Sequence, residues 1–268
     1  MDTVFGYRLD PRTDEQGNDL LAKDWDSKTL LASLPVLQPG DVDLRPYCTD
    51  TNQWQLSACA GNATADAIEI ETAIQESIRA AAEGRQPRTI PQLARLFVYA
   101  LARTLWNELG KDEGTYIRTC FQVLSDFGIC EEADWPYEDS KVFVSPSMIA
   151  QRKATGRKIK GYYRIKSTGR ERLDEIIAAL RACHPVVFGT LINEDFRAKK
   201  GPKVVSRPTG ATIGGHAMII VGFIDGLFLV KNSWGSDWRE GGFVFVTPDY
   251  FTWEETTDLW VPTVGYSL

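Results

Sequence analysis

The sequence GGHAMIIVGFIDGLFLVKNSWG, residues 214–235, contains two apolar runs of the kind that form buried β-strands. The dipeptide Asp225-Gly226 separates the runs, and Asp-Gly between apolar runs is a strong signal for a hairpin turn. The predicted hairpin brings His216, which opens the first run, beside Asn232, which follows the second. A side-chain amide can orient an imidazole ring, so this pair is half of a catalytic site that still needs a nucleophile.

The size and composition are those of a soluble globular protein. The chain has 268 residues, enough for one large domain or two fused lobes, with 43% hydrophobic and 25% charged residues. The net charge of −6 argues against a nucleic-acid partner, which would require a basic face. The basic clusters at residues 152–164 and 197–203 are expected to lie on solvated loops or faces.

Nothing in the sequence indicates a membrane association. No apolar run reaches about 18 residues, and the N-terminus lacks an apolar stretch after a basic start. We therefore expect no membrane span and no secretory signal in this chain. The localisation stays open between the cytoplasm and export without a cleavable leader.

The five cysteines form a sparse, odd-numbered set without C-x-x-C spacing. This pattern predicts neither a disulfide framework nor a zinc site, and no metal or cofactor is expected. Cys48, Cys120, Cys130 and Cys183 are interpreted as small, mostly apolar side chains. Cys59 differs from them because it stands at the first turn of a predicted helix.

The predicted elements divide the chain into a leader and an α+β domain. Residues 1–41 are polar and rich in turn signals, which predicts an arm without a core of its own, and residues 42–268 form the domain. Apolar spacing predicts helices over about 59–84, 91–109, 116–127 and 171–183. Short apolar runs between glycines predict strands at 186–188, 218–223, 227–230 and 243–246. A helical lobe (about 50–140) and a β-rich lobe (about 141–268) would enclose a cleft.

The start of a helix suits a cysteine nucleophile, because the thiolate is the reactive form of the side chain. The positive end of the helix dipole and a neighbouring imidazolium both lower a thiol pKa, and these effects would act on Cys59 from its own helix and from His216. Asn232 would orient the imidazole, and Trp234 would shield their hydrogen bond from water.

The same chemistry requires an oxyanion hole. The backbone N–H of Cys59 is one natural donor, and a side-chain amide just upstream is the other. Gln53 and Gln55 both qualify on position alone.

Three pieces of the sequence together resemble the papain-like cysteine peptidases: Gln53-x5-Cys59, Gly215-His216-Ala217, and Lys231-Asn232-Ser233-Trp234-Gly235-x2-Trp238. Asn232 follows His216 by 16 residues, as in that family. The family's glutamine lies six residues before its cysteine, which selects Gln53. The resemblance covers about residues 42–247 and implies a two-lobe α+β fold, with a helical left lobe and a β-barrel-like right lobe. Leu56 and Ala60 replace a disulfide-forming cysteine and a tryptophan of the family, which looks like its disulfide-poor bacterial branch.

By the same resemblance, substrate lies between two walls of the cleft. The implied substrate-binding residues are Gly114, Tyr116, Ile117, Gly189, Gly214, Gly215, Ala217 and Trp234. Tyr116 and Ile117 would line the apolar pocket that dominates specificity. The implied partners are a peptide or protein substrate and cystatin-like or other protein inhibitors.

The implied activity is that of a cysteine endopeptidase that forms a thioester at Cys59 and holds the oxyanion with Gln53 and the Cys59 N–H. Two alternatives remain open: a non-hydrolytic peptide-binding or regulatory protein on the same fold, and a transpeptidase or other acyl transferase with the same nucleophile. The leader, residues 1–41, is too short for the family's long helical propeptide. We nevertheless expect that it can lie across the cleft and limit access.

Overall fold

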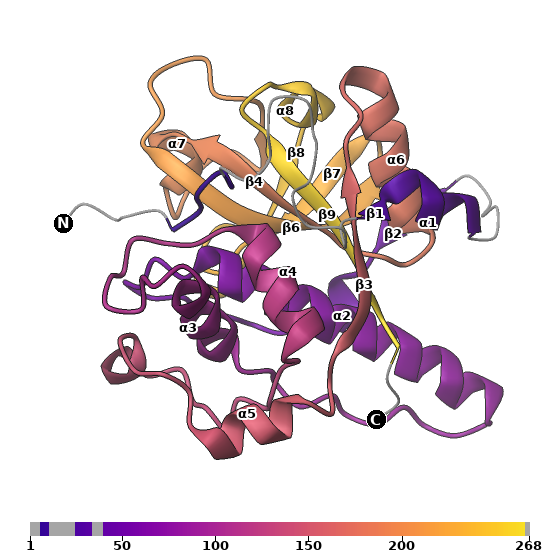
Figure 1. The fold of residues 1–268 in the computed structure, drawn as a ribbon. Coiled ribbons are helices and arrows are strands. Elements are labelled where there is room, and N and C mark those ends of the chain that lie inside the picture. The colour runs from indigo at the N-terminus through magenta and orange to yellow at the C-terminus, as the bar shows by residue number, and fades with distance from the viewer. Residues whose placement is uncertain (1–5, 11–24, 34–39, 266–268) are drawn as a thin grey trace.

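The structure is a computed structural model that describes residues 6–10, 25–33 and 40–265. The first two ranges belong to the predicted leader, and the rest of the leader up to residue 39 lies outside the described residues. Figure 1 shows a large sheet on one side of helix α2 (Cys59–Ala82) and a group of helices on the other. The predicted α+β fold is confirmed.

Three of the four predicted helices are found within two residues of their expected ends, as α2, α4 and α6. The α-helices other than α2 are α1 (Ser27–Ser33), α3 (Arg95–Leu105), α4 (Ile117–Asp126), α5 (Met148–Ala154), α6 (Gly169–Arg181), α7 (Glu194–Arg197) and α8 (Pro248–Thr252), and the 3₁₀ turns are η1 (Arg45–Tyr47) and η2 (Asp139–Lys141). Helix α3 is shorter than the predicted 91–109, because Leu93 forms a β-bridge with Glu131 and Ala94 N donates to Cys130 O. None of the helices in the described ranges is long and apolar enough to span a bilayer.

Nine strands among the described residues form one sheet, in the order β1-β3-β9-β4-β6-β7-β8-β5, with β2 also paired to β6. They are β1 (Trp25–Asp26), β2 (Val42–Asp43), β3 (Ile159–Ile165), β4 (Val186–Ile192), β5 (Val204–Val205), β6 (Gly214–Ile224), β7 (Leu227–Lys231), β8 (Phe243–Val246) and β9 (Thr257–Val264). The short strands β1 and β5 end the path and do not pair with each other, so the described sheet is open. The barrel-like closure expected for the right lobe is therefore absent from the described strands.

The predicted hairpin is confirmed as the antiparallel pair β6 and β7. Ile224 pairs with Leu227, and the two residues between them, Asp225 and Gly226, have φ angles of 50° and 80°. Two consecutive positive φ angles are what a two-residue hairpin turn of type I′ requires. The turn therefore fixes the register that places the two ends of the hairpin together.

The sequence patterns missed three strands (β3, β5 and β9) and three short helices (α5, α7 and α8) of the β-rich half. The basic cluster 152–164, expected on a solvated loop or face, contributes to α5 and β3, and β3 is mostly buried with only Lys160 exposed. Strand β9 was not predicted either; it contains Pro262, a residue that argues against an internal strand. Because β9 lies between β3 and β4, these strands are needed to connect the whole sheet.

Helix α2 is the central element of the molecule. Every residue from 59 to 72 is buried, because the helix packs against α3 and α4 on one side and against β6 and β9 on the other. Its buried carboxylates bind groups from other parts of the chain. Asp66 pairs with Lys231 of β7, Glu69 accepts from Thr49 Oγ1 at 2.6 Å, and Glu71 lies 2.8 Å from His184 Nδ1.

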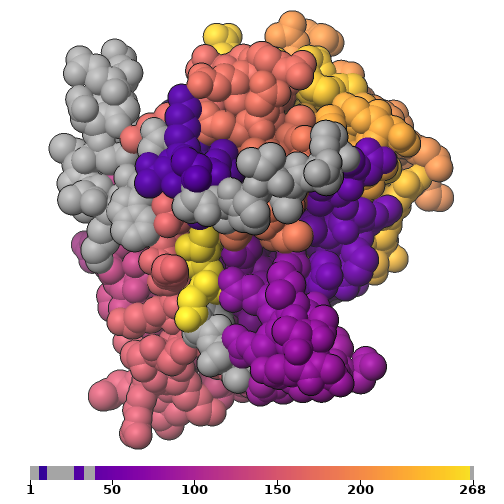
Figure 2. Space-filling view, turned by 90° about the vertical axis from the view of Figure 1, so that its right-hand side faces the viewer, coloured from indigo at the N-terminus to yellow at the C-terminus, as the bar shows by residue number. Residues whose placement is uncertain are grey.

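The second described part of the leader packs on the surface of the domain. Figure 2 shows helix α1, in indigo, against the salmon helix α6. Lys28 Nζ lies 2.8 Å from Glu171 Oε1, and Ser27 Oγ donates to Glu175. Strand β1 pairs in parallel with β3, so this part of the leader extends the sheet.

The buried ion pair of Lys231 and Asp66 should be important for stability. Both side chains are at most 3% exposed, and Lys231 Nζ also donates to Thr51 Oγ1 at 2.7 Å. Removing one partner leaves a buried charge uncompensated, so Lys231→Met is expected to lower the free energy of unfolding by roughly 3–5 kcal/mol in urea titrations. The matched control is Lys203→Met, which removes an exposed pair with Glu240 and should leave the free energy of unfolding nearly unchanged. Equal effects of the two substitutions would contradict this account.

Candidate active site

The segment that leads into α2 is joined to the segment that follows β7. Gln53 N donates to Ser233 O at 2.8 Å, and Ser233 Oγ donates to Gln53 Oε1 at 2.7 Å. Asn52 and Trp234 form an antiparallel bridge next to this pair. These contacts hold the start of α2 in a fixed position relative to the hairpin.

Cys59 is the first residue of α2, as predicted, and it is fully buried. Burial raises the pKa of the Cys59 thiol to about 12, although hydrogen bonds from the backbone N–H groups of Ala217 and Gly6 oppose this shift. The sequence predicted a lowered pKa from the helix dipole and an imidazolium neighbour. In the conformation described, the loss of solvent outweighs these effects, and the thiol is protonated at neutral pH.

The hairpin brings His216 and Asn232 into direct contact, as predicted. His216 Nε2 lies 2.8 Å from Asn232 Oδ1, which also accepts from Ser233 N at 2.8 Å. Since the amide oxygen only accepts, this bond requires the proton on Nε2 and reserves Nδ1 for another partner. Burial lowers the pKa of His216 to about 4, with the Asn232 bond acting in the opposite direction, so the buried imidazole is neutral.

Trp234 covers the His216 ring. The two ring centroids are 4.6 Å apart with an interplanar angle of 23°, a stacked arrangement. Trp238 and Phe196 pack edge-on against Trp234 and hold it in place. The sequence analysis expected Trp234 to shield the hydrogen bond between His216 and Asn232, and the structure places the indole against the face of the imidazole.

Gly6, from the first part of the leader, lies against the nucleophile candidate. Its carbonyl oxygen accepts from Thr115 N at 2.8 Å, while its N–H is directed at the sulfur of Cys59. The fit is so close that a Cβ atom on Gly6 would lie 1.6 Å from Ser57 O. A Cβ on Gly114, which has a φ of 85°, would meet Gly6 O at 2.1 Å. Two glycines that face each other thus permit the close approach.

Tyr7 lies between the helical side and the sheet side of the molecule. Its backbone forms a parallel bridge with Thr115 on the helical side, and Tyr7 N donates to Gly215 O at 3.4 Å on the sheet side. Its ring packs on Gly189, where an added Cβ would lie 2.1 Å from Tyr7 Cζ. The hydroxyl group lies 2.8 Å from Thr257 Oγ1 and donates to Asp258 Oδ2 at 3.2 Å. Tyr7 is therefore held by backbone and side chain at once.

Arg8 binds residues 6–8 to the helical side of the molecule. Arg8 Nη1 lies 2.6 Å from Glu108 Oε2, and the guanidinium carbon lies 4.7 Å from the centre of the Tyr116 ring. Arg8 N also donates to Thr115 O at 3.2 Å. The Glu108 carboxylate contributes to a raised pKa of Arg8, against the effect of burial, so the residue stays charged.

The predicted substrate-binding residues fall into two groups. Gly114, Tyr116, Gly189, Gly215 and Ala217 all lie beside residues 6–8 or beside Cys59, which residues 6–8 cover. Ile117 is fully buried in the hydrophobic core at the start of α4, and Gly214 stands opposite Ile192 at the start of β6. Trp234, in contrast, lines a separate hollow.

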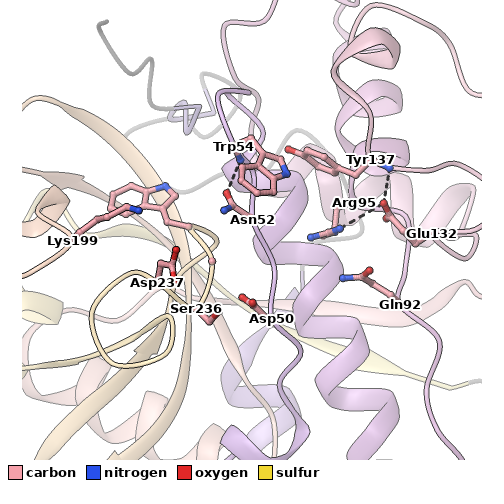
Figure 3. Close-up of a pocket in the computed structure, with 12 residues that line it drawn as sticks. Asp50, Asn52, Trp54, Gln92, Arg95, Glu132, Tyr137, Lys199, Ser236 and Asp237 are labelled. Atoms are coloured by element: carbon pink, nitrogen blue, oxygen red, sulfur yellow. Dashed lines mark hydrogen bonds and ion pairs between the residues drawn. The ribbon is translucent and has the colours of Figure 1, made fainter.

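That hollow opens between the helical side and the loop after β7. It measures about 510 Å³ and is lined by Asp50, Asn52, Trp54, Gln92, Arg95, Glu132, Tyr137, Lys199, Trp234, Gly235, Ser236 and Asp237. Figure 3 shows Arg95, Glu132 and Tyr137 on one wall and Lys199, Ser236 and Asp237 on the other, with Trp54 at the edge. Trp234 lines the hollow and also stacks on His216, so its indole lies between the hollow and the imidazole.

The sequence analysis did not identify the residues that hold Tyr7. Thr115 contributes only backbone groups, which any residue has, and Thr257 and Asp258 are contributed by the strand that was missed. Asp258 has a φ of 50°, a conformation that aspartate adopts more readily than most residues. In the described ranges, no group of three or more His, Cys, Asp or Glu side chains could hold a metal ion, and the five cysteines are free thiols.

Comparison with known proteins points to one family. The model of the papain family cysteine proteases matches residues 107–253. A peptidase C1-like protein of Acanthamoeba polyphaga mimivirus is 32% identical over 244 residues, which are 85% of this chain and 75% of that protein. The crystal structure of xylellain, a cysteine protease from Xylella fastidiosa, superposes with a TM-score of 0.77 at 26% identity, over 98% of this chain and 97% of that one.

A second solved structure has the same fold. The Carica candamarcensis cysteine protease in complex with E-64 gives a TM-score of 0.62 at 21% identity, over 85% of this chain and all of that one. The family match covers more than half of the chain, and the viral relative is similar over most of both sequences. The protein therefore belongs to the papain family of cysteine proteases and is a peptidase.

Proposed function

We propose that this peptidase is an endopeptidase that cuts peptide bonds with Cys59, His216 and Asn232. The observation that carries the proposal is the 2.8 Å contact between His216 Nε2 and Asn232 Oδ1, beside a cysteine at the start of a helix. With Nε2 committed to Asn232, Nδ1 is the ring nitrogen left to exchange a proton with the sulfur. Asn232 is then a positioning residue, and Cys59 and His216 are the reacting groups.

The proposed reaction has two stages. The thiol proton passes to His216, the sulfur forms a bond with the carbonyl carbon, and the peptide C–N bond breaks as the imidazolium gives its proton to the leaving amine. Water then gives a proton to His216 and adds to the thioester, and the C–S bond breaks to release the acid and restore the thiol. No further reactant is required.

The oxyanion is proposed to bind the backbone N–H of Cys59 and the side-chain amide of Gln53. Gln53 Nε2 donates one hydrogen to Leu56 O at 2.9 Å, and its oxygen is held by Ser233, so the amide orientation is fixed. The second hydrogen on Nε2 remains for the substrate. Gln55, the alternative donor, is exposed and lacks this support.

Cleavage within a chain needs room on both sides of the cut bond. The track occupied by Tyr7, between Thr115 and Gly215, supplies one side. The polar hollow would supply the other, since it has a different lining and is separated from His216 by the Trp234 side chain alone. This arrangement favours an endopeptidase.

We further propose that residues 6–10 are an inhibitory part of the leader. They cover Cys59, which is fully buried, and they place an N–H group rather than a carbonyl carbon at the sulfur. The Gly6 carbonyl, which would be the electrophile, is held by Thr115 N at 2.8 Å instead of by the oxyanion donors. The segment thus occupies the site without being positioned for attack.

Displacing residues 6–10 should make Cys59 reactive. Gly6→Ala places a methyl group 1.6 Å from Ser57 O, so it should expel the segment and hydrate the thiol. We expect the rate of Cys59 alkylation by iodoacetamide at pH 7, followed by mass spectrometry, to rise at least ~100-fold as the thiol pKa falls toward its usual value. The control is Gly40→Ala, whose added methyl meets nothing within 4 Å.

The pH profile of the same reaction has a defined direction. With burial raising the thiol pKa to about 12, alkylation of the natural chain should be slow at neutral pH and keep rising into strongly alkaline solution. In the Gly6→Ala chain, it should already level off near neutral to mildly alkaline pH. Rapid alkylation of natural Cys59 at pH 7 would show that residues 6–10 do not block the site.

Catalysis is best tested in the Gly6→Ala chain with a fluorogenic peptide. Cys59→Ala or His216→Ala should abolish hydrolysis, and Gln53→Ala should lower kcat by ~10²–10³. The matched control is Gln55→Ala, which should retain full activity because Gln55 is exposed to solvent. Hydrolysis that survives Cys59→Ala would refute the mechanism. A reactive Cys59 without any hydrolysis would instead favour the non-hydrolytic binding protein.

A further inference from the structure

We infer that the pocket occupied by Tyr7 is a substrate pocket that selects tyrosine, and that Thr257 and Asp258 make this selection. The inference rests on the proposed peptidase function of the same site and adds the class of side chain that it accepts. It changes the expectation of an apolar specificity pocket, because the far end of the observed pocket is polar.

The backbone contacts of Tyr7 are ones that any extended peptide can make. They join Tyr7 and its neighbours to Thr115 N, Thr115 O and Gly215 O, and none of these groups belongs to a side chain. A substrate strand between the same two walls has the same groups available. The backbone therefore holds a peptide without regard to sequence, and the side-chain pocket is left to discriminate.

The shape of the pocket suits a flat ring. Its wall at Gly189 has no side chain, and an added Cβ would fall 2.1 Å from Tyr7 Cζ and 2.4 Å from Tyr7 Cε2. Gly189 is in the middle of β4, paired with Ala217 on one side and Thr257 on the other, so the wall is a rigid strand. The missing side chain makes the space in which the ring lies.

The end of the pocket recognises a hydroxyl group. Tyr7 is 8% exposed, and its hydroxyl lies 2.8 Å from Thr257 Oγ1 and 3.2 Å from Asp258 Oδ2. Asp258 is itself buried, at 2% exposure. A phenylalanine ring would fill the same space but leave the carboxylate and the threonine without this partner. The loss of these two hydrogen bonds in a largely buried pocket disfavours phenylalanine.

The charge around Asp258 disfavours a basic side chain. Arg164 Nη2 lies 3.7 Å from Asp258 Oδ1, so the carboxylate already has a cationic neighbour. A lysine or arginine of the substrate would have to enter a desolvated pocket next to Arg164, where like charges repel. A neutral group that donates one hydrogen bond, such as the tyrosine hydroxyl, matches both the charge and the geometry.

The first experiment needs no peptidase activity. In the full natural chain, Tyr7→Phe and Thr257→Val should each accelerate alkylation of Cys59 by iodoacetamide by about 10-fold or more, because each removes the hydrogen bond between the Tyr7 hydroxyl and Thr257. The double variant should be no faster than Tyr7→Phe alone, since Thr257 has already lost its partner in that variant. The matched control is Thr263→Val, in the same strand but hydrogen-bonded to Gly161 instead of Tyr7. Additive effects of the two changes would overturn the inference.

The second experiment uses the full chain with Gly6→Ala and fluorogenic peptides that carry Tyr, Phe or Lys at each of the three positions before the cut bond. At one position we expect kcat/KM for tyrosine to exceed that for phenylalanine by about 10-fold, with lysine lower still. Thr257→Val should bring the ratio of tyrosine to phenylalanine close to one, and Thr263→Val should leave it unchanged.

The outcomes separate the two proposals. Equal kcat/KM values for tyrosine and phenylalanine at all three positions overturn the pocket assignment and leave the peptidase mechanism standing. Absence of hydrolysis refutes the peptidase mechanism, and the alkylation experiment then decides by itself whether Thr257 recognises the tyrosine hydroxyl.

Discussion

The geometry of the site depends on the pairing of Gln53 with Ser233. Through two hydrogen bonds, this pair joins the segment that begins α2 to the segment that ends the β6–β7 hairpin. Cys59 is in the first segment and Asn232 in the second, so the distance between nucleophile and imidazole is set by a contact that includes neither. The buried pair of Asp66, about two helical turns after Cys59, and Lys231, directly before Asn232, joins the same two elements a second time. The helix and the hairpin thus behave as one unit.

Burial has opposite consequences for fold and for chemistry. In the fold, the buried carboxylates of α2 join the helix to other parts of the chain, because each of them has a partner: Glu69 binds Thr49, Glu71 binds His184 and Asp66 binds Lys231. At Cys59 and His216, however, the same loss of solvent raises the thiol pKa and lowers the imidazole pKa, which favours two neutral groups over a thiolate and an imidazolium. Residues 6–10 contribute directly to that environment. A segment that occupies the groove therefore changes the protonation state of the site as well as access to it.

The sequence was most informative where one local pattern was sufficient. Residue type and spacing predicted the Asp225-Gly226 turn, the helix start at Cys59 and the pairing of His216 with Asn232. The structure contains all three. The pocket around Tyr7 could not be predicted. Thr257 and Asp258 are 250 and 251 residues away along the chain, and they reach Tyr7 only because β9 pairs with β4. The basic side chains of residues 152–164 are exposed or half-buried, as expected, but strand β3 was missed for a related reason: burial of Ile159 to Ile165 depends on β9 and β1, not on local charge.

The packing of α1 on α6 has a consequence for how the proposed inhibition would respond to its surroundings. Lys28 and Ser27 attach the leader to the domain independently of Gly6 and Tyr7, so residues 6–10 stay near the groove even after they leave it. A tethered ligand competes at an effective local concentration, often millimolar, that dilution of the protein does not alter. Substrate would have to approach that concentration, or bind correspondingly tightly, to replace the segment. The enzyme would then respond to a threshold of substrate, and its blocked state would return when substrate is exhausted, without any covalent change.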